Sequence, residues 1–270
     1  MAAATNLGQR VTLATVSVLL ALSAVAWYYT VRQAETMSGM VTGLAQIGSG
    51  MPGGIAPPVF LGMWLTMMIA MMFPTIGPMV LAHRVVVRHR GEGWPPTAAF
   101  VLGYLFIWTA IGLVPLGAFL AFRNLPATIG SSLWLRALAG AILLVAGLYQ
   151  FTPWKAVCLK ACRSPFAFLL EHDFGGGTRS AFRAGASHGA YCLGCCWALM
   201  SLLVVVGLMN VVWMAGLALV FLAEKNWRYG AALSKVAGVA VGLLGIAVVV
   251  DPGLLTWVGG GMLRASGAGM

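Results

Sequence analysis

Long apolar runs alternate with short polar segments along the whole chain. The runs cover residues of about 11–30, 59–82, 97–122, 132–151, 189–208, 211–223 and 230–250. An α-helix needs roughly 20 apolar residues to cross the hydrocarbon core of a bilayer, and most of these runs have that length. The pattern predicts an all-α fold: a polytopic transmembrane helix bundle of about seven helices (six to seven), forming a single integral membrane domain over residues 1–270.

The sixth run is short, and only Asn210 separates it from the fifth. It predicts either a tight helical hairpin or a span that Glu224 to Trp227 complete at the interface. The first run leaves a different alternative open, because Ala24-Val25-Ala26 after an apolar stretch also fits a cleaved secretory signal.

Composition supports a lipid environment. Hydrophobic residues make up 60% of the chain and charged residues only 8%, whereas a soluble domain carries roughly a quarter charged residues. The lipid bilayer is therefore the expected partner. The net charge of +10 lies mostly in the segments between runs, so we attribute it to membrane topology and expect no nucleic-acid binding.

The basic residues also predict an orientation. With the N-terminus inside, eleven of the sixteen Lys and Arg residues fall in inner segments and four in outer ones. The positive-inside rule favours that arrangement. It makes residues 31–58 an outer loop and residues 152–187 an inner loop that bears cysteines.

The cysteines form two groups, and all five lie between positions 158 and 196. Cys158 and Cys162 have the spacing C-x3-C, which places both sulfurs on one face of a helix. Pro153 can begin that helix and Pro165 can end it. His188, Cys192 and Cys196 follow at i, i+4 and i+8, with Cys195 beside them.

Both groups are expected at the same inner face of the membrane, which indicates a soft metal site. Thiolates select Cu(I), Zn(II) or iron–sulfur clusters. Two other interpretations stay open. Buried cysteines can be simple packing residues, and Cys192-x-x-Cys195 has the spacing of thiol–disulfide oxidoreductases, although the predicted topology puts it on the reducing side.

Methionines form a second soft surface in the second run. Met63, Met67 and Met71 lie on one helical stripe, with Met68 and Met72 flanking it. A thioether is a neutral, weak, soft donor, so this surface favours Cu(I) and makes zinc a weaker candidate. The alternative is that methionine fills gaps in the core. Pro74 and Pro78 predict a break in this helix.

The remaining polar residues give weaker indications of function. Glu224 and Lys225 stand at a helix end and are interpreted as an interfacial ion pair. His83 and His89 flank arginines in an inner basic patch. The sequence Gly185-Ala-Ser-His-Gly189 matches G-x-S-x-G, but the α/β sheet of a nucleophile elbow is not predicted. We therefore expect no catalytic and no cofactor-binding residues, and no enzyme activity unless the redox alternative holds.

Three stretches resemble a bacterial family described as predicted metal-binding integral membrane proteins, formerly a domain of unknown function. They are Met63 to Thr75, Tyr149 to Pro165 and Gly185 to Met200. Some members are thought to be copper chaperones that deliver copper to oxidases such as tyrosinase. The resemblance implies a copper role, a copper-dependent oxidase as client, and location in a bacterial inner (cytoplasmic) membrane.

The predicted function is thus a multi-pass membrane Cu(I) chaperone or delivery factor that works by exchange between Cys and Met ligands. The first alternative is a membrane thiol–disulfide oxidoreductase, and the second is a structural or assembly subunit without metal. The predicted metal-site residues are Cys158, Cys162, Cys192, Cys195, Cys196, His188, Met63, Met67, Met68, Met71 and Met72.

Overall fold

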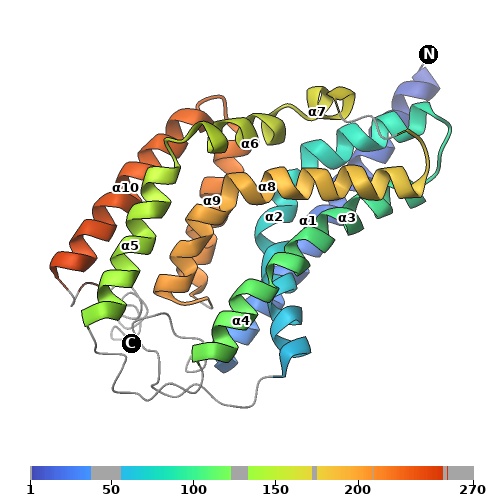
Figure 1. Ribbon diagram of the computed structural model, residues 1–270. Helices are drawn as coiled ribbons and strands as arrows, with labels where there is room; N and C mark the ends of the chain where they lie inside the picture. Colours follow the sequence, from blue (N-terminus) through green and yellow to red (C-terminus); the bar gives the residue numbers. More distant parts are fainter. Residues whose placement is uncertain are drawn as a thin grey trace, which may run out of the picture.

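The computed structural model of the protein describes residues 2–37, 56–122, 133–171, 175–208, 210–251 and 254. These residues form helices and no strands, which confirms the predicted all-α bundle (Figure 1). The helices are α1 (Ala2–Met37), α2 (Pro57–His89), α3 (Pro95–Ile111), α4 (Leu113–Phe122), α5 (Leu133–Tyr149), α6 (Pro153–Arg163), α7 (Pro165–Glu171), α8 (Thr178–Val206), α9 (Val211–Asn226) and α10 (Gly230–Val250).

Five stretches of the described chain are long and apolar enough to cross a membrane: 12–35, 57–89, 95–118, 178–206 and 230–250. A sixth span arises if α5 and α6, which are bent by 63°, count as one. That number meets the lower end of the expected range. The short sixth run forms α9, which starts directly after the turn at the end of α8, and Asn210 caps it by accepting a hydrogen bond from the Trp213 N–H.

The two predicted loops differ from what the sequence suggested. α1 extends to Met37 and α2 begins at Pro57, so the outer loop is shorter than 31–58, and residues 38–55 lie outside the described part. The predicted inner loop 152–187 is largely helical, since it contains α6, α7 and the first turns of α8. The helix predicted between Pro153 and Pro165 is confirmed as α6, and its N-cap is Thr152, whose hydroxyl accepts the Lys155 N–H.

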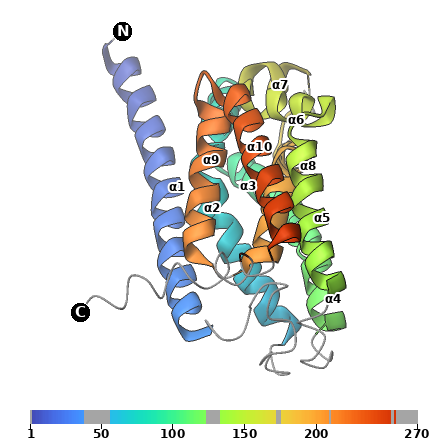
Figure 2. The same cartoon turned by 90° about the vertical axis from the view of Figure 1, so that its left-hand side faces the viewer.

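α6 lies across one end of the bundle, above the ends of α5, α9 and α10, and α7 continues from it toward α2 (Figures 1 and 2). The amphipathic pattern of α6 explains this position. Lys155 and Leu159 are buried against the bundle, whereas Trp154 and Val157 point outward with exposed fractions of 76% and 61%. A helix that presents large apolar side chains on its outer face suits the membrane interface.

Close packing of α3 on α8 positions the segment that carries three of the cysteines. A Cβ atom added at Gly185 would overlap the Phe100 backbone, and one added at Gly103 would overlap the Phe182 carbonyl group. Glycine therefore lets the two backbones touch, as small residues commonly do between membrane helices. Gly147 and Gly238 allow the same approach between α5 and α10.

The predicted break in α2 is not present, because the helix runs through Pro74 and Pro78 without interruption, and a contact from α1 compensates for the first proline. Pro74 has no N–H group, so the carbonyl of Ala70, four residues earlier, loses its helical partner. The hydroxyl of Ser23 in α1 donates to that carbonyl at 2.9 Å. The freed backbone group is thereby satisfied inside an apolar environment.

Candidate metal centre

Three thiols converge where α6 crosses α8. Cys162 comes from α6, and Cys192 and Cys195 come from α8; their Sγ atoms all lie within 4.8 Å of one another. We call these three residues the thiol triad. Cys192 and Cys195 are fully buried, whereas Cys162 is partly exposed. Such a group has the donors and the spacing to hold one metal ion.

The separations in the triad suit a metal ion better than a disulfide. The Sγ atoms of Cys162 and Cys195 are 3.8 Å apart, and all five cysteines are free thiols. A disulfide requires about 2.05 Å between sulfurs. With metal–sulfur bonds of about 2.3 Å, three sulfurs around one ion stand roughly 4 Å apart. The triad therefore needs little movement to close around an ion.

The other two cysteines border the triad without belonging to it. Cys196 lies 3.4 Å from Cys195, measured between their sulfurs, and is buried. Cys158 is partly exposed and faces Gly194 of α8, where an added Cβ would lie 2.5 Å from its sulfur. The two cysteine groups, which the predicted topology put at one face of the membrane, lie together, and the structure divides them into a triad and two neighbours.

His188 is not brought into the triad. Its side chain is buried against the rings of Phe100, Tyr104 and Phe168, and among the described residues its Nδ1 atom has no hydrogen-bond partner. Tyr104 connects the two features, because its hydroxyl lies 3.1 Å from the Cys192 sulfur. In this arrangement the imidazole belongs to an aromatic cluster beside the thiols.

The methionines predicted as ligands are all buried. Met67, Met68, Met71 and Met72 pack in the same apolar core as the buried cysteines, and Met63 is buried outside it. Met72 is linked to the triad through Lys225, whose ammonium group contacts both the Met72 sulfur and the Cys192 sulfur. The structure therefore joins one end of the methionine surface to the thiols.

The interfacial ion pair predicted between Glu224 and Lys225 is wrong. The Lys225 Nζ atom lies 3.1 Å from the Cys192 sulfur, 3.2 Å from the Thr75 hydroxyl and 3.9 Å from the Met72 sulfur. Glu224 does not pair with it, because its carboxylate accepts from Lys155 at 2.8 Å, and both of those side chains are buried. Adjacent residues of a helix point about 100° apart, so Glu224 and Lys225 reach different neighbours.

Basic residues of α6 fasten it over the triad. Besides the Lys155–Glu224 ion pair, Arg163 donates to the carbonyl groups of Glu224 at 2.6 Å and Arg228 at 3.3 Å. The two contacts bind both ends of α6 to the end of α9. Cys162, the residue directly before Arg163, is held against α8 as a result.

A family model described as a copper chaperone (PpoB2) matches residues 61–248, which is more than half of the chain. The chain belongs to this copper chaperone family. The match includes the thiol triad, Lys225 and the methionines of α2, and it confirms the resemblance noted from the sequence. Comparisons with curated proteins and with solved structures found no match.

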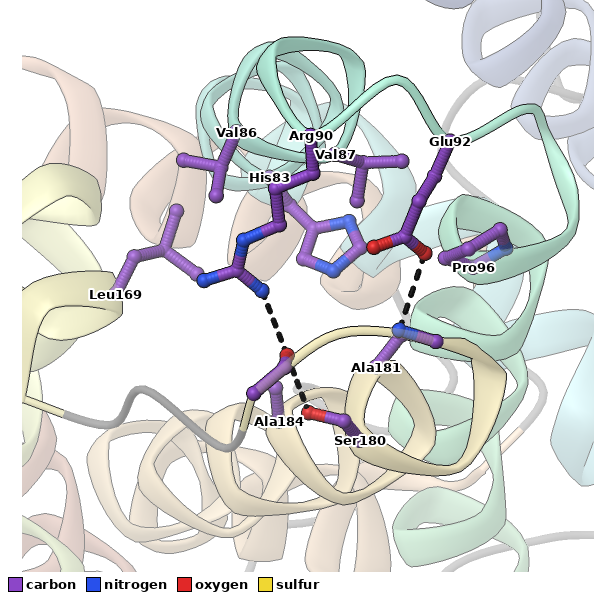
Figure 3. A pocket seen from close by; sticks show the side chains of 12 residues that line it. His83, Val86, Val87, Arg90, Glu92, Pro96, Leu169, Ser180, Ala181 and Ala184 are labelled. Atoms are coloured by element: carbon purple, nitrogen blue, oxygen red, sulfur yellow. Dashed lines mark hydrogen bonds between the residues drawn. The ribbon is translucent and has the colours of Figure 1, made fainter.

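A small cavity lies away from the thiols of this copper chaperone family protein. It is found where the turn between α2 and α3 meets the start of α8. Figure 3 shows His83, Arg90 and Glu92 pointing into it. The Glu92 carboxylate accepts the Gly177 N–H at 3.0 Å, and Arg90 donates to the Gly175 carbonyl at 2.6 Å. The cavity measures about 40 Å³, enough for a water molecule or two. Its polar groups anchor the N-terminus of α8, the helix that carries the thiols.

Proposed function

We propose that the protein captures Cu(I) at the thiol triad and passes it on by ligand exchange, as a membrane copper chaperone. The observation that carries this proposal is the convergence of three sulfurs from α6 and α8 within 4.8 Å, in an apolar surrounding. The family description supports copper as the metal. The bacterial inner membrane with the N-terminus inside remains the proposed location.

The chemistry of the donors favours Cu(I) over hard cations. Thiolate and thioether groups are soft ligands, while Mg²⁺ and Ca²⁺ require several carboxylate or carbonyl oxygens. The carboxylate of Glu224, which contacts α6, is already paired with Lys155. An ion that enters this site therefore meets sulfur on most sides.

Ligand exchange would follow the accessibility of the sulfurs. Cys158 is partly exposed on α6, one turn before Cys162, and suits an entry ligand. The triad would then hold the ion, and Met72 beyond Lys225 would accept it toward the methionine surface of α2. Thiolates bind Cu(I) more strongly than thioethers, so this order separates capture from release. A copper-dependent oxidase is the proposed recipient.

The redox alternative is less compatible with the burial of the thiols. Thiol–disulfide exchange needs an attacking group to reach a sulfur atom. Cys192 and Cys195, the C-x-x-C pair, have exposed fractions of 0% and 1%. A partner's thiol or a quinone would have to displace α6 before it could react.

A Cu(I) titration tests the proposal. The protein would be purified anaerobically in detergent, and Cu(I) would be titrated against a competing chelator for the wild type and for Cys162→Ser, Cys192→Ser and Cys195→Ser. We expect each triad change to weaken binding at least tenfold. Cys158→Ser is the matched control and should retain the equilibrium affinity within about threefold while slowing the loading.

Two results would overturn the proposal. One is the absence of Cu(I) binding to a folded wild-type protein. The other is a loss of two free thiols on treatment with a quinone, abolished by Cys192→Ser or Cys195→Ser, which would establish the redox alternative. Thermal unfolding of each variant separates ligand loss from misfolding.

A further inference from the structure

Lys225 places a positive charge directly against the thiol triad. Its side chain is 5% exposed, and its ammonium group contacts the Cys192 sulfur at 3.1 Å. The other two contacts, Thr75 and Met72, are neutral. A lysine in this position therefore belongs to the electrostatics of the metal centre.

A buried ammonium requires a counter-charge, and carboxylates do not supply it here. The salt bridges formed within the described segments are Arg32–Glu35 and Lys155–Glu224, neither of which includes Lys225. The Cys192 sulfur, which touches the Lys225 ammonium, supplies a negative charge when it is a thiolate, as it is when it binds a metal ion. Paired charges of this kind are what permit ionised groups in an apolar interior.

The same charge acts on any metal ion that the triad binds. Consider two different ions bound by the same thiolates. The attraction between Lys225 and the thiolates is then the same in both complexes. Lys225 repels the ion itself in proportion to the ion's charge, so a divalent ion meets twice the repulsion of a monovalent one. At contact distances in a protein interior, one unit of charge changes affinity by about tenfold or more.

We propose that Lys225 is a specificity-determining residue that favours monovalent Cu(I) over divalent ions such as Zn(II) at the thiol triad. The inference rests on the proposed function, because it assumes that the triad holds a metal ion. Thiolates alone do not provide this selection, since zinc sites are also built from cysteine. A fixed positive charge beside the sulfurs supplies the missing discrimination.

The test compares Cu(I) and Zn(II) affinities in the purified full-length protein, each measured by chelator competition. Only binding that Cys195→Ser abolishes is counted, so that zinc bound elsewhere does not contribute. The variants are Lys225→Gln and Lys225→Leu, which remove the charge without adding a soft donor, and Lys225→Arg, which keeps it. Lys160→Gln is the matched control, because this lysine of α6 is exposed and two residues before Cys162, which puts it on the other side of the helix.

We expect the preference for Cu(I) over Zn(II) to fall at least tenfold in Lys225→Gln and in Lys225→Leu. It should stay within threefold of the wild type in Lys225→Arg and in Lys160→Gln. An unchanged preference in both neutral variants would overturn the inference, and so would an equal fall in Lys160→Gln.

The design separates this inference from the proposed function. If the wild-type triad binds no Cu(I), the proposed function fails. If it binds Cu(I) and the neutral variants keep the wild-type preference, only the role of Lys225 fails. Thermal unfolding and elution as a single species identify folded variants, and Lys225→Gln retains an N–H donor toward Thr75 if the leucine variant is unstable.

Discussion

The sulfur atoms of Cys162 and Cys195 lie 3.8 Å apart although 33 residues separate them in the chain. The contact exists because α6 turns by 63° away from α5 and crosses α8. One thiol of the triad thus comes from a short helix at the end of the bundle, and two come from a long helix in its core. The attachment of α6 decides whether the site is complete.

The buried ion pair that anchors α6 gives the first prediction. Lys155→Met or Glu224→Gln leaves one charged partner in an apolar environment, and we expect each to cost about 3–5 kcal/mol of stability. Cu(I) affinity should fall with it, because Cys162 loses its position. Thermal unfolding in detergent and chelator competition measure the two effects.

The exposed pair Arg32–Glu35 provides the control for that prediction. Glu35→Gln should change stability by less than about 1 kcal/mol, since exposed ion pairs contribute little. The double variant Lys155→Met/Glu224→Gln should recover part of the loss. If the single variants are as stable as the wild type, the ion pair does not hold α6 in place.

Gly194 tests the close contact between α8 and α6. An alanine Cβ there would lie 2.5 Å from the Cys158 sulfur, so Gly194→Ala should push α6 outward. We expect a loss of about 1–3 kcal/mol, as for other overpacked sites, together with weaker Cu(I) binding. Thermal unfolding and Cu(I) competition are the measurements.

Removal of the opposing sulfur should reverse this effect. Gly194→Ala combined with Cys158→Ala is expected to regain most of the stability lost in the single glycine variant. Gly62→Ala on α2 is the matched control, because no atom lies within 4 Å of the added Cβ and a helical alanine is favoured over glycine by about 0.5–1 kcal/mol. A double variant no more stable than Gly194→Ala would refute the steric explanation.

Ser23 and Pro74 should be energetically coupled across α1 and α2. Ser23→Ala removes the hydroxyl that satisfies the Ala70 carbonyl, and we expect it to cost about 1–2 kcal/mol. In a Pro74→Ala background, residue 74 regains its N–H and can bond that carbonyl itself. Ser23→Ala should then be close to neutral, and equal costs in both backgrounds, by thermal unfolding, would contradict the coupling.

Thiol labelling tests the order of access and the predicted sidedness together. In the metal-free protein Cys158 and Cys162 should react with a maleimide faster than Cys192, Cys195 and Cys196, which are buried. Cu(I) should protect Cys162 and leave Cys158 reactive. Mass spectrometry of digested samples measures each site.

The same reagent in a membrane-impermeant form reports on orientation. Labelling of Cys158 in inside-out vesicles, and its absence in right-side-out vesicles, is expected if the N-terminus lies inside. The opposite result would reverse the topology inferred from the basic residues. It would leave the geometry of the triad unaffected.

Local sequence patterns predicted much of this site, because the spacing of residues along a helix determines which side chains share a face. Prolines 153 and 165 and the spacing of Cys158 and Cys162 were sufficient to predict α6, and the structure confirms that helix. The intervals of four residues between His188, Cys192 and Cys196 placed them on one face of α8, where all three are buried. Which neighbour each side chain meets depended on the packing of other helices.

The contacts of Lys225 could not be predicted from its neighbours in the sequence. Glu224 next to it suggested an ion pair at the interface, yet Glu224 turns to Lys155, 69 residues away, and Lys225 turns to Cys192, 33 residues away. Charged residues at the end of an apolar helix are a signal for a functional site as much as for an interface. The sequence shows that Lys225 is a charged residue at the end of an apolar helix, but it does not show that its side chain contacts Cys192.

By itself the sequence determined the membrane character, the helical class and the two soft-donor segments of this protein, because hydrophobicity, proline positions and helical spacing act over a few turns. Only the tertiary structure decided that Cys162 joins Cys192 and Cys195, that His188 turns to aromatic rings, and that Lys225 faces the thiols. Those outcomes depend on how α6 and α9 pack against α8. Contacts between distant segments follow from the shape and charge of the whole bundle.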